Sequence, residues 1–449
     1  MSALRRFKPY AAYKDSGVDW LGEIPAHWAV KRLRTTVGSC QNGVWGEEPD
    51  GVHDIACVRV ADFDRVAFRV DVSELTIRSI EPGVAAARRL RRADLLLEKS
   101  GGGESQPVGT VVIYDHELPA VCSNFVARVQ ISTGNNARFL TYLHACLYAL
   151  RLNTRHIKQS TGIQNLDSSS YLGEPVGLAP EPEQQAIAAF LDRETGRIDA
   201  LVAKNQRLIG LLQERREALI TRAVTKGLDP SVPLKDSGVD WLGQIPADWH
   251  CLSLKRVAWI RYGLGEPPQL LADGLPFVRA TNVAKGRIVE TDLQFVDPGD
   301  VPWNRSPGLR AGDIIVVRSG AYTGDSAIVS PEYDGGIAGY DMVVSVQGAV
   351  SEFVAWALLS RYVLEAQIEL DSLRAAQPHL NAEQLGAVVL AVPPEVEQRS
   401  IAAFLSRETA RIDALIAKVR EAIGRLKELR TALISAAVTG KIDVRGVAA

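Results

Sequence analysis

The sequence lacks the short motifs that mark common kinds of catalytic site. It contains no phosphate-binding G-x-x-x-x-G-K-[ST], no H-E-x-x-H and no G-x-S-x-G, and the amino-methyltransferase tetrapeptide N-P-P-[FY] is also missing. The glycine-rich residues 100–104 have no lysine that could reach a phosphate. The seven histidines are scattered, and we interpret them as surface or core residues. The sequence therefore favours a chain with no catalytic site and no bound cofactor of its own.

Paired cysteines and long apolar runs are also missing. The five cysteines are odd in number and have no spacing typical of metal or redox sites, so they predict free thiols in a cytosolic protein. They are Cys40, Cys57, Cys122, Cys146 and Cys251. No apolar run approaches the ~20 residues needed to cross a bilayer. We therefore expect a cytoplasmic protein with no metal site and no membrane segment.

An excess of positive charge is absent. The net charge is −2, so any nucleic-acid site must be a local basic patch. Hydrophobic residues make up 46% and charged residues 23% of the chain, which is ordinary for a globular protein. With 449 residues, the chain can form two or three domains with cores of their own.

One stretch of sequence, the arm, occurs twice. Residues 14–22 (KDSGVDWLG) return unchanged as residues 235–243, and Ile-Pro-Ala and a tryptophan follow both copies. We interpret the duplicated tryptophans as core residues that hold each arm in place. They are Trp20, Trp28, Trp241 and Trp249. The chain therefore consists of two copies of one unit, in the order arm, globular segment and long helix.

The long helix is the second duplicated element. Residues 183–226 and 397–441 contain no proline, and the motifs IAAFL and RIDAL recur between them with a shift of 214 residues. At ~1.5 Å per residue, each helix is roughly 65 Å long. A narrow apolar stripe on so long a helix needs a partner helix. We therefore predict that the two helices pack together as an antiparallel coiled coil.

The heptad pattern predicts which residues face the partner helix. One seam position holds Leu191, Ile198, Leu212 and Leu219 in the first helix, and Leu405, Ile412, Val419, Leu426 and Leu433 in the second. The other seam position is predicted to hold Leu201, Leu208, Leu415 and Leu429. The remaining faces are charged.

The two globular segments share a skeleton but differ in most residues. Residues 58–59, 90–95, 100–101 and 124–126 are matched with residues 278–279, 309–314, 319–320 and 341–343. Strands are predicted at residues 55–60, 94–98, 110–114, 125–131, 277–280, 313–318 and 342–346. One capped helix is expected after Asn136 and another after Ser351. The predicted fold class is α+β: two globular α/β segments joined by two long antiparallel helices in a coiled coil, with an internal pseudo-two-fold repeat.

The duplicated arm, the duplicated helix motif E-Q-x-x-I-A-A-F-L-x-R-E-T-x-R-I-D-A-L and the L-x-x-[GA]-D-[LI]-[LI] strand before Ser-Gly carry a family resemblance. Over its whole length, the chain resembles the specificity subunit of type I DNA restriction–modification enzymes. The resemblance implies the following boundaries: arm 1–28, target-recognition domain 29–179, long helix 180–228, second arm 229–249, second target-recognition domain 250–391 and second long helix 392–449.

The resemblance also implies a function. The chain would be a non-catalytic subunit that reads a split, asymmetric target in double-stranded DNA, one half per globular segment. The helices would act as a spacer and would dock two methyltransferase subunits, with restriction and translocase subunits joining through them. S-adenosylmethionine would be bound by the methyltransferase.

Candidate DNA contacts in the first segment fall into three stretches. A basic run could contact phosphates or could be a solvated turn, the loop after the shared strand could approach DNA or be an ordinary glycine hairpin, and a polar run could reach base edges or only cap and turn. The candidates are Arg88, Arg89, Arg91 and Arg92; Lys99, Ser100 and Gly101; and Lys158, Gln159, Gln164 and Asn165.

The second segment offers fewer candidates of the same kinds. They are Arg318, Ser319, Tyr322 and Thr323 in the loop, and Gln377 and His379 before the second helix. Weaker candidates of the same kind open the two segments: Gln41, Asn42 and Gly43 in the first, and Arg261, Tyr262 and Gly263 in the second. Because the second segment is poor in lysine and arginine, an alternative function stays open: a non-catalytic coiled-coil scaffold that holds two protein clients.

Overall fold

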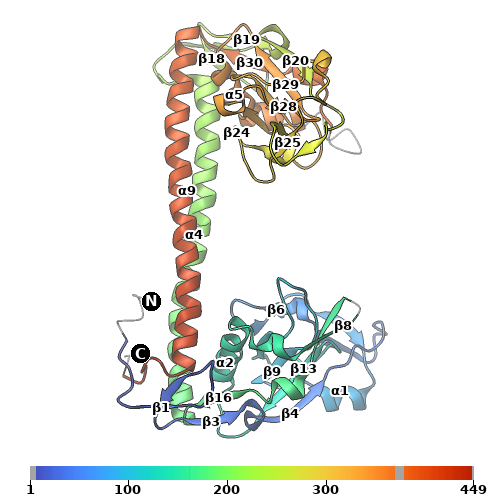
Figure 1. The fold of residues 1–449 in the computed structure, drawn as a ribbon, viewed down its shortest axis with the longest axis vertical. Coiled ribbons are helices and arrows are strands. Elements are labelled where there is room, and N and C mark those ends of the chain that lie inside the picture. Colours follow the sequence, from blue (N-terminus) through green and yellow to red (C-terminus); the bar gives the residue numbers. More distant parts are fainter. Residues whose placement is uncertain (1–6, 161, 370–378, 447–449) are drawn as a thin grey trace. The chain divides into compact units, whose positions relative to one another are not determined.

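The computed structural model describes residues 7–160, 162–369 and 379–446. The chain forms two compact units, and each contains one globular segment together with parts of both long helices (Figure 1). Unit 1 comprises residues 1–205 and 421–449, and unit 2 comprises residues 206–420.

The two long helices are α4 (Glu181–Lys226) and α9 (Glu395–Val438), of 46 and 44 residues. Asp199 pairs with Arg430 in unit 1 and Arg216 pairs with Asp413 in unit 2, so the partner number falls as the α4 number rises. The predicted antiparallel coiled coil is thereby confirmed. Gly227 directly follows α4 and Gly440 lies two residues beyond the end of α9, and both are in the left-handed region (φ +74° and +70°), where a side chain would be strained.

One predicted seam position holds buried residues, and the other was misplaced by one residue. Leu191, Ile198, Leu405, Ile412 and Leu433 are buried, and the other predicted residues of this position, Leu212, Leu219, Val419 and Leu426, are partly buried. The three leucines Leu201, Leu208 and Leu415 are 42–50% exposed and are corrected to the outer edge of the helix pair, whereas Leu429 is partly buried and packs against the core of unit 1. The second seam position instead follows four residues after the first and holds Thr195, Val202, Ile209 and Arg216 in α4, and Thr409, Ile416, Ile423 and Arg430 in α9.

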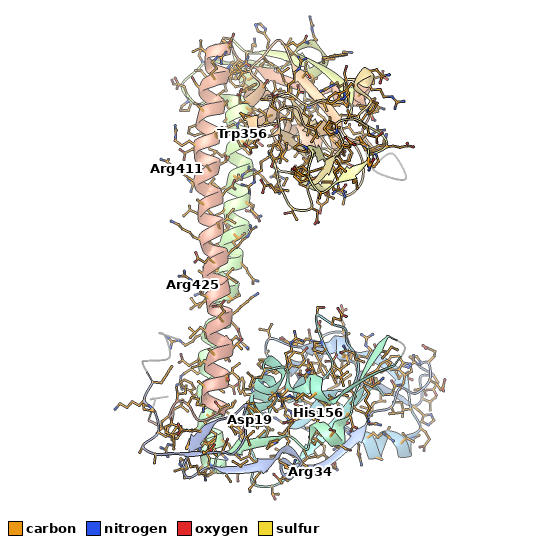
Figure 2. The ribbon with its side chains drawn as sticks, viewed as in Figure 1. Asp19, Arg34, His156, Trp356, Arg411 and Arg425 are labelled. Atoms are coloured by element: carbon orange, nitrogen blue, oxygen red, sulfur yellow. The ribbon has the colours of Figure 1, made fainter. Side chains whose placement is uncertain are left out.

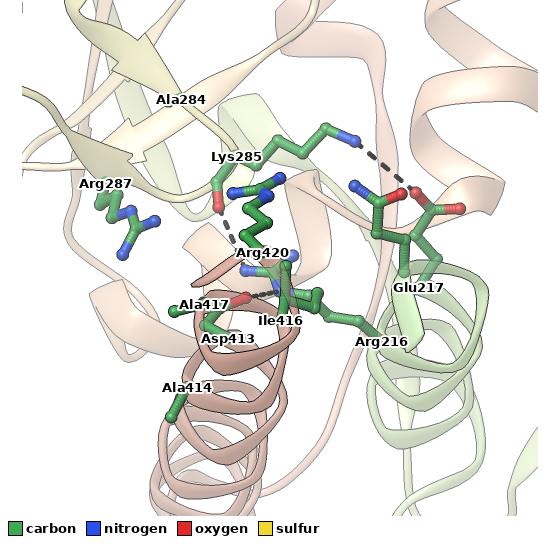
Figure 3. A pocket seen from close by; sticks show the side chains of 11 residues that line it. Arg216, Glu217, Ala284, Lys285, Arg287, Asp413, Ala414, Ile416, Ala417 and Arg420 are labelled. Carbon is green, nitrogen blue, oxygen red and sulfur yellow. Dashed lines mark hydrogen bonds and ion pairs between the residues drawn. The ribbon is translucent and has the colours of Figure 1, made fainter. Parts of the chain in front are cut away.

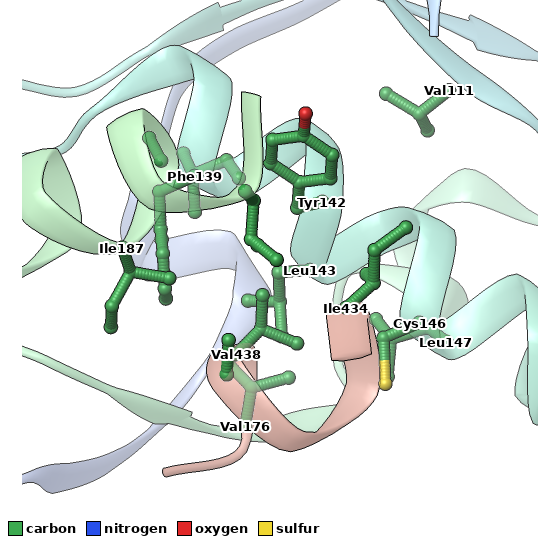
Figure 4. Packing of buried hydrophobic residues seen from close by; sticks show 14 of the residues in the cluster. Val111, Phe139, Tyr142, Leu143, Cys146, Leu147, Val176, Ile187, Ile434 and Val438 are labelled. Carbon is green, nitrogen blue, oxygen red and sulfur yellow. The ribbon is translucent and has the colours of Figure 1, made fainter. Parts of the chain in front are cut away.

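The core of unit 1 joins both long helices to the globular segment. Ile434 and Val438 of α9 lie among Phe139, Leu143 and Leu147 of α2 (Ala137–Ala149), as Figure 4 shows. The asparagine before α2 caps it: Asn136 Oδ1 accepts a hydrogen bond from the N–H of Phe139 at 2.9 Å. Unit 2 has a corresponding core, in which α4 and α9 pack against α5 (Ser351–Leu358).

The arms are held at the first turn of each long helix. Trp28 and Trp249 are fully buried and donate their indole N–H groups to Glu183 and Glu397, both at 3.0 Å. These two tryptophans confirm the prediction of core packing. Trp241 differs, because it stacks on Tyr362 with ring centroids 5.7 Å apart but remains 40% exposed.

The globular part of unit 1 is built on a six-stranded sheet and two three-stranded sheets. The first has the order β4 (Val37–Asn42), β13 (Val126–Ile131), β9 (Asp94–Glu98), β11 (Val111–Tyr114), β7 (Arg69–Val70) and β6 (Phe63–Asp64). The second contains β12 (Ala120–Cys122), β5 (Asp54–Val58) and β8 (Thr76–Ser79), and the third β10 (Ser100–Gly101), β15 (Ile163–Leu166) and β14 (Ile157–Ser160). The pairs β16 (Pro175–Leu178) with β3 (Ala29–Arg32) and β1 (Tyr13–Asp15) with β2 (Glu23–Pro25), and the helices α1 (Pro82–Arg88) and α3 (Ser168–Tyr171), complete it.

Unit 2 repeats this plan with two four-stranded sheets. They are β20 (Ala258–Tyr262), β29 (Met342–Val346), β26 (Ile314–Val316), β27 (Ser326–Ile328), and β21 (Leu270–Leu271), β25 (Gln294–Val296), β22 (Leu275–Val278), β28 (Ile337–Ala338). Three strand pairs accompany these sheets: β23 (Val283–Ala284) with β24 (Arg287–Ile288), β19 (His250–Ser253) with β30 (Val389–Val392), and β17 (Leu234–Asp236) with β18 (Gln244–Pro246). The short helices of unit 2 are α6 (Arg361–Val363) and α8 (Ala382–Ala387). The cap expected from Ser351 is wrong, because Ser351 is the first residue of α5 and its N-cap is Val350.

The corrected seam predicts unequal effects of two neighbouring substitutions. Ile198→Ala removes a buried side chain and should lower the unfolding free energy of unit 1 by about 2–4 kcal/mol. Leu201→Ala, at a position that is 48% exposed, should change it by less than about 1 kcal/mol. Native-state hydrogen exchange of amides 187–205 measures both, and equal losses would contradict the corrected seam.

A buried histidine should make unit 1 less stable in acid. Burial lowers the pKa of His144 from 6.5 to about 4, and His144 Nδ1 lies 2.8 Å from the Tyr171 hydroxyl. Between these pH values the unfolded chain binds a proton that the folded chain does not, so stability falls as the pH falls from about 6.5 to 4, by up to about 3 kcal/mol. Urea unfolding from pH 7.5 to 4.5 should show a shallower pH dependence for His144→Gln than for the wild type.

Candidate nucleic-acid interface

In unit 1, two of the predicted contact stretches form one small sheet. β10 pairs with β15, which places Ser100 opposite Asn165 and Gly101 opposite Gln164. β15 also pairs with β14, where Lys158 lies opposite Asn165 and Gln159 lies opposite Gln164. Residues that are about sixty positions apart in the sequence therefore share one surface.

Hydrogen bonds between side chains hold residues of this sheet and next to it in place. Lys99 Nζ donates to Asn42 Oδ1 at 2.6 Å, and Ser100 Oγ donates to Asn165 Oδ1 at 2.6 Å. Asn42 and Asn165 are both exposed. The cluster presents one cation and two amides to solvent, which are groups that can pair with base edges or phosphates.

Gln164 and Lys158, also predicted as DNA contacts, differ from each other in exposure. Gln164 is buried, and its Oε1 accepts a hydrogen bond from the N–H of Val108 at 3.2 Å, so it supports the sheet and we remove it from the candidate contacts. Lys158 is exposed and donates to Asp167 at 2.8 Å; this bond is the main cause of the lowered pKa of Asp167.

A recess of about 440 Å³ opens beside Ser100 and Gly101. Trp45 and Phe125 line it and are 37% and 49% exposed. The guanidinium carbon of Arg78 lies 4.6 Å from the centre of the Trp45 ring, within the range of a cation–π contact. Aromatic rings at such a site offer faces on which bases can stack.

The basic run around residue 90 divides into a structural and an exposed part. Arg88 donates hydrogen bonds to the carbonyl groups of Asn42 and Gly43, so it supports the backbone that carries the Asn42 side chain. Arg89 and Arg91 are exposed, and the side chain of Arg92 lies 3.7 Å from that of Glu117. The three exposed arginines stay candidates for phosphate contacts.

In unit 2, Arg318 is the centre of the corresponding cluster. Its guanidinium carbon lies 4.7 Å from the Tyr262 ring centre and 4.2 Å from that of Tyr340. Arg318 Nη2 lies 3.2 Å from Nε2 of His379. Tyr262 and Tyr340 are 43% and 47% exposed, so this cation rests on aromatic surface that faces solvent.

The other candidates of unit 2 lie around this cluster. Ser319 forms an antiparallel bridge with His379. Tyr322 is 58% exposed, whereas the hydroxyl of Thr323 donates to the carbonyl of Gly320 at 2.8 Å and closes the turn. Gln377 lies outside the described residues.

The strand registers give the correspondence between the two units. In unit 1, Asn42, Ala127 and Leu97 lie opposite one another on the neighbouring strands β4, β13 and β9. In unit 2, Tyr262, Met342 and Val316 lie opposite one another on the equivalent strands β20, β29 and β26. The N–H of Leu166 donates to the carbonyl of Lys99 at 2.7 Å, and the N–H of Leu380 donates to that of Arg318 at 2.8 Å. Residues 124–126 are therefore shifted relative to the match with 341–343 predicted from sequence, and Phe125 corresponds to Tyr340.

Comparisons with known proteins give relatives of one kind. No family model matches the chain. The EcoBI specificity subunit of a type I restriction enzyme from Escherichia coli is 25% identical over 341 residues, covering 73% of this chain and 70% of the relative. The putative MjaX specificity subunit of a type I restriction enzyme from Methanocaldococcus jannaschii is 22% identical over 444 residues, covering 95% and 96%.

Solved structures share the fold over most of the chain. A chain from a study of complex assembly and conformational transition in a type I restriction–modification system has a TM-score of 0.69 at 17% identity, covering 93% of this chain and 99% of that one. The HsdS subunit from Thermoanaerobacter tengcongensis has a TM-score of 0.51 at 16% identity, covering 93% and 98%. The chain is similar to type I restriction enzyme specificity subunits in sequence and in fold.

An arginine attaches a hairpin of each globular segment to the helix pair of its unit. In unit 2, Arg216 Nη2 donates to the carbonyl of Lys285 at 3.2 Å, and Arg216 Nε lies 3.4 Å from Asp413 of the other helix (Figure 3). In unit 1, Arg430 donates to the carbonyl of Val66 and to both carboxylate oxygens of Asp199. We call each arrangement the hairpin clamp.

Sequence reasoning missed several residues of the candidate interface. Trp45 and Tyr340 lie outside the stretches that were matched between the two segments, and the match of residues 124–126 with 341–343 hid the correspondence of the exposed Phe125 and Tyr340. The ion pairs of the hairpin clamp could have been found from the sequence, because both partners recur with the 214-residue shift of the helices: Asp199 as Asp413, and Arg216 as Arg430.

The described residues contain neither a metal-binding cluster nor a helix that could span a membrane. Within residues 7–160, 162–369 and 379–446, no group of three or more His, Cys, Asp or Glu side chains could hold a metal ion. No helix in the described part of the chain is long and apolar enough to cross a membrane.

The hairpin clamp should stabilise the hairpin that it contacts. Arg216→Met removes the bond to Lys285, and hydrogen bonds to charged groups contribute about 1.5–3 kcal/mol, so amides 283–288 should exchange about tenfold faster or more. Arg215→Met, at a neighbouring exposed position, is the matched control and should leave the rate unchanged. Hydrogen exchange measured by mass spectrometry tests this, and equal rates in both variants would contradict the clamp.

Proposed function

We propose that this chain is the specificity subunit of a type I restriction–modification complex: a non-catalytic protein that reads a split, asymmetric sequence in double-stranded DNA. The observation that carries the proposal is the position of the two exposed clusters. Lys99 and Arg318 occupy the same register in two units of the same fold, each beside exposed polar or aromatic side chains. Two different surfaces on one repeated frame suit two different half-sites.

The globular segments 29–179 and 250–391 are the proposed target-recognition domains. Because the net charge is −2, the attraction to DNA must come from local groups. Arg89, Arg91 and Arg92 would add phosphate contacts in unit 1, which increase affinity without carrying sequence information. The base contacts would come from the two clusters.

The long helices are the proposed docking site for methyltransferase subunits. Arg197 and Arg411 are copies of each other, and their side chains are 72% and 67% exposed. Figure 2 shows Arg411 projecting from α9 on the side away from α4. A partner that recognises this face on one helix would find the same residues on the other, which suits two identical subunits. S-adenosylmethionine would be bound by those subunits, restriction subunits would join through them, and the complex would act in the cytoplasm.

Methylation mapping tests the proposal directly. The chain is expressed together with the methyltransferase subunit of its system, and methylated adenines are located across the host genome. We expect a split motif methylated on both strands. A second chain, in which residues 29–178 are replaced by the same segment of another specificity subunit, should change one half of the motif and leave the other half intact.

Other outcomes have defined meanings. A stable complex with the methyltransferase but no sequence-specific methylation would contradict the proposal and favour the scaffold for protein clients. A change in both half-sites after replacement of one segment would contradict the assignment of one half to each unit.

A further inference from the structure

We infer that four corresponding positions in each unit determine which bases that unit reads. This inference rests on the proposed function and names its specificity-determining residues. In unit 1 the positions hold Asn42, Lys99, Phe125 and Asn165; in unit 2 they hold Tyr262, Arg318, Tyr340 and His379. We call these two sets the reading clusters.

The first argument is geometric, because the positions correspond by backbone register and not by sequence similarity. Asn42 and Tyr262 end the equivalent strands β4 and β20, and each is followed by a glycine whose N–H bonds the equivalent carbonyl, of Val126 or Asp341. Asn165 and His379 lie opposite equivalent serines, Ser100 and Ser319. The fold therefore brings the same four positions together twice.

The second argument is the contrast between these positions and their surroundings. Residues that build the frame around each reading cluster are the same in both units: Gly43 and Gly263, Ser100 and Ser319, Gly101 and Gly320, and Leu166 and Leu380. The four positions of the cluster differ in every case, although the cation and its neighbouring aromatic residue keep their chemical type. A frame that is kept while the exposed side chains change is expected where two units read different sequences.

The third argument concerns the chemistry of Arg318. Its contacts with Tyr262 and Tyr340 restrict the long side chain, so less conformational entropy is lost when it binds. Among the described residues, Nη2 lies within hydrogen-bond distance of His379, Nε is buried without a hydrogen-bond partner, and Nη1 has no hydrogen-bond partner. An arginine presented in this way matches the O6 and N7 acceptors of guanine in the major groove. We therefore assign to Arg318 the reading of a guanine in the half-site of unit 2.

Binding measurements on Arg318 test the assignment. The full chain in complex with its methyltransferase is titrated with duplexes that carry each of the four base pairs at every position of the half-site. Arg318→Gln should weaken binding of the preferred duplex on the order of 10- to 100-fold and make one position indifferent to the base pair. Arg318→Lys should lose the same preference while keeping the charge. Arg305→Gln, at an exposed position of the same unit, is the matched control and should behave as the wild type.

A transplant tests the whole cluster. The four substitutions Asn42→Tyr, Lys99→Arg, Phe125→Tyr and Asn165→His place the residues of unit 2 on the frame of unit 1. Three of the four positions are exposed and Lys99 is half-buried, so the fold of unit 1 should be kept, as checked by its thermal unfolding. Methylation mapping should then show a changed first half-site and an unchanged second half-site.

The outcomes separate this inference from the proposed function. If the wild type methylates no split motif, the proposed function fails. If it does, and Arg318→Gln weakens all duplexes equally and lowers the salt slope of binding by about one, Arg318 is a phosphate contact and the inference is overturned. A folded transplant that keeps the original motif would also overturn it.

Discussion

The fold of each unit depends on a glutamate–glutamine pair in the first turn of its long helix. In unit 1, the buried Glu183 accepts hydrogen bonds from Trp28 and Tyr10, and Gln184 bonds the backbone N–H of Asn136, where α2 begins. A buried carboxylate is costly unless its oxygens are bonded, so arm and helix must be in place together. Unit 2 repeats the arrangement, since Glu397 accepts from Trp249 and Gln398 bonds the N–H of Val350.

Polar residues within the coiled coil are likewise paired with partners. Arg216 and Arg430 occupy seam positions that are usually apolar, and each faces an aspartate of the opposite helix. Polar residues at seam positions fix the register of a coiled coil at some cost in stability. Here they have a second use, because each arginine also bonds the backbone of a hairpin in its own unit. Helix register and hairpin position are therefore set by one side chain.

The sequence predicted the elements that local patterns encode. The strands at residues 94–98 and 342–346 match β9 and β29, the cap at Asn136 is present, and both long helices begin within two residues of their predicted starts. The second seam position was misplaced because leucines at 201 and 208 fit a spacing of three, whereas the true row at a spacing of four contains a threonine and an arginine that resemble surface residues. Packing between helices decides between these rows, and a single helix pattern cannot.

The exposed clusters show a different limit of prediction from the sequence. Lys99 and Arg318 could be found because they precede a serine and a glycine that both copies keep. Phe125 and Tyr340 could not, since the loop before them differs in length and only strand register reveals that they correspond. Residues that bond the frame are constrained by partners inside the chain, as Arg88 is by two carbonyl groups. The outward side chains have few such partners, so the fold leaves them free to differ, and a surface built this way can change what it reads without disturbing the units that carry it.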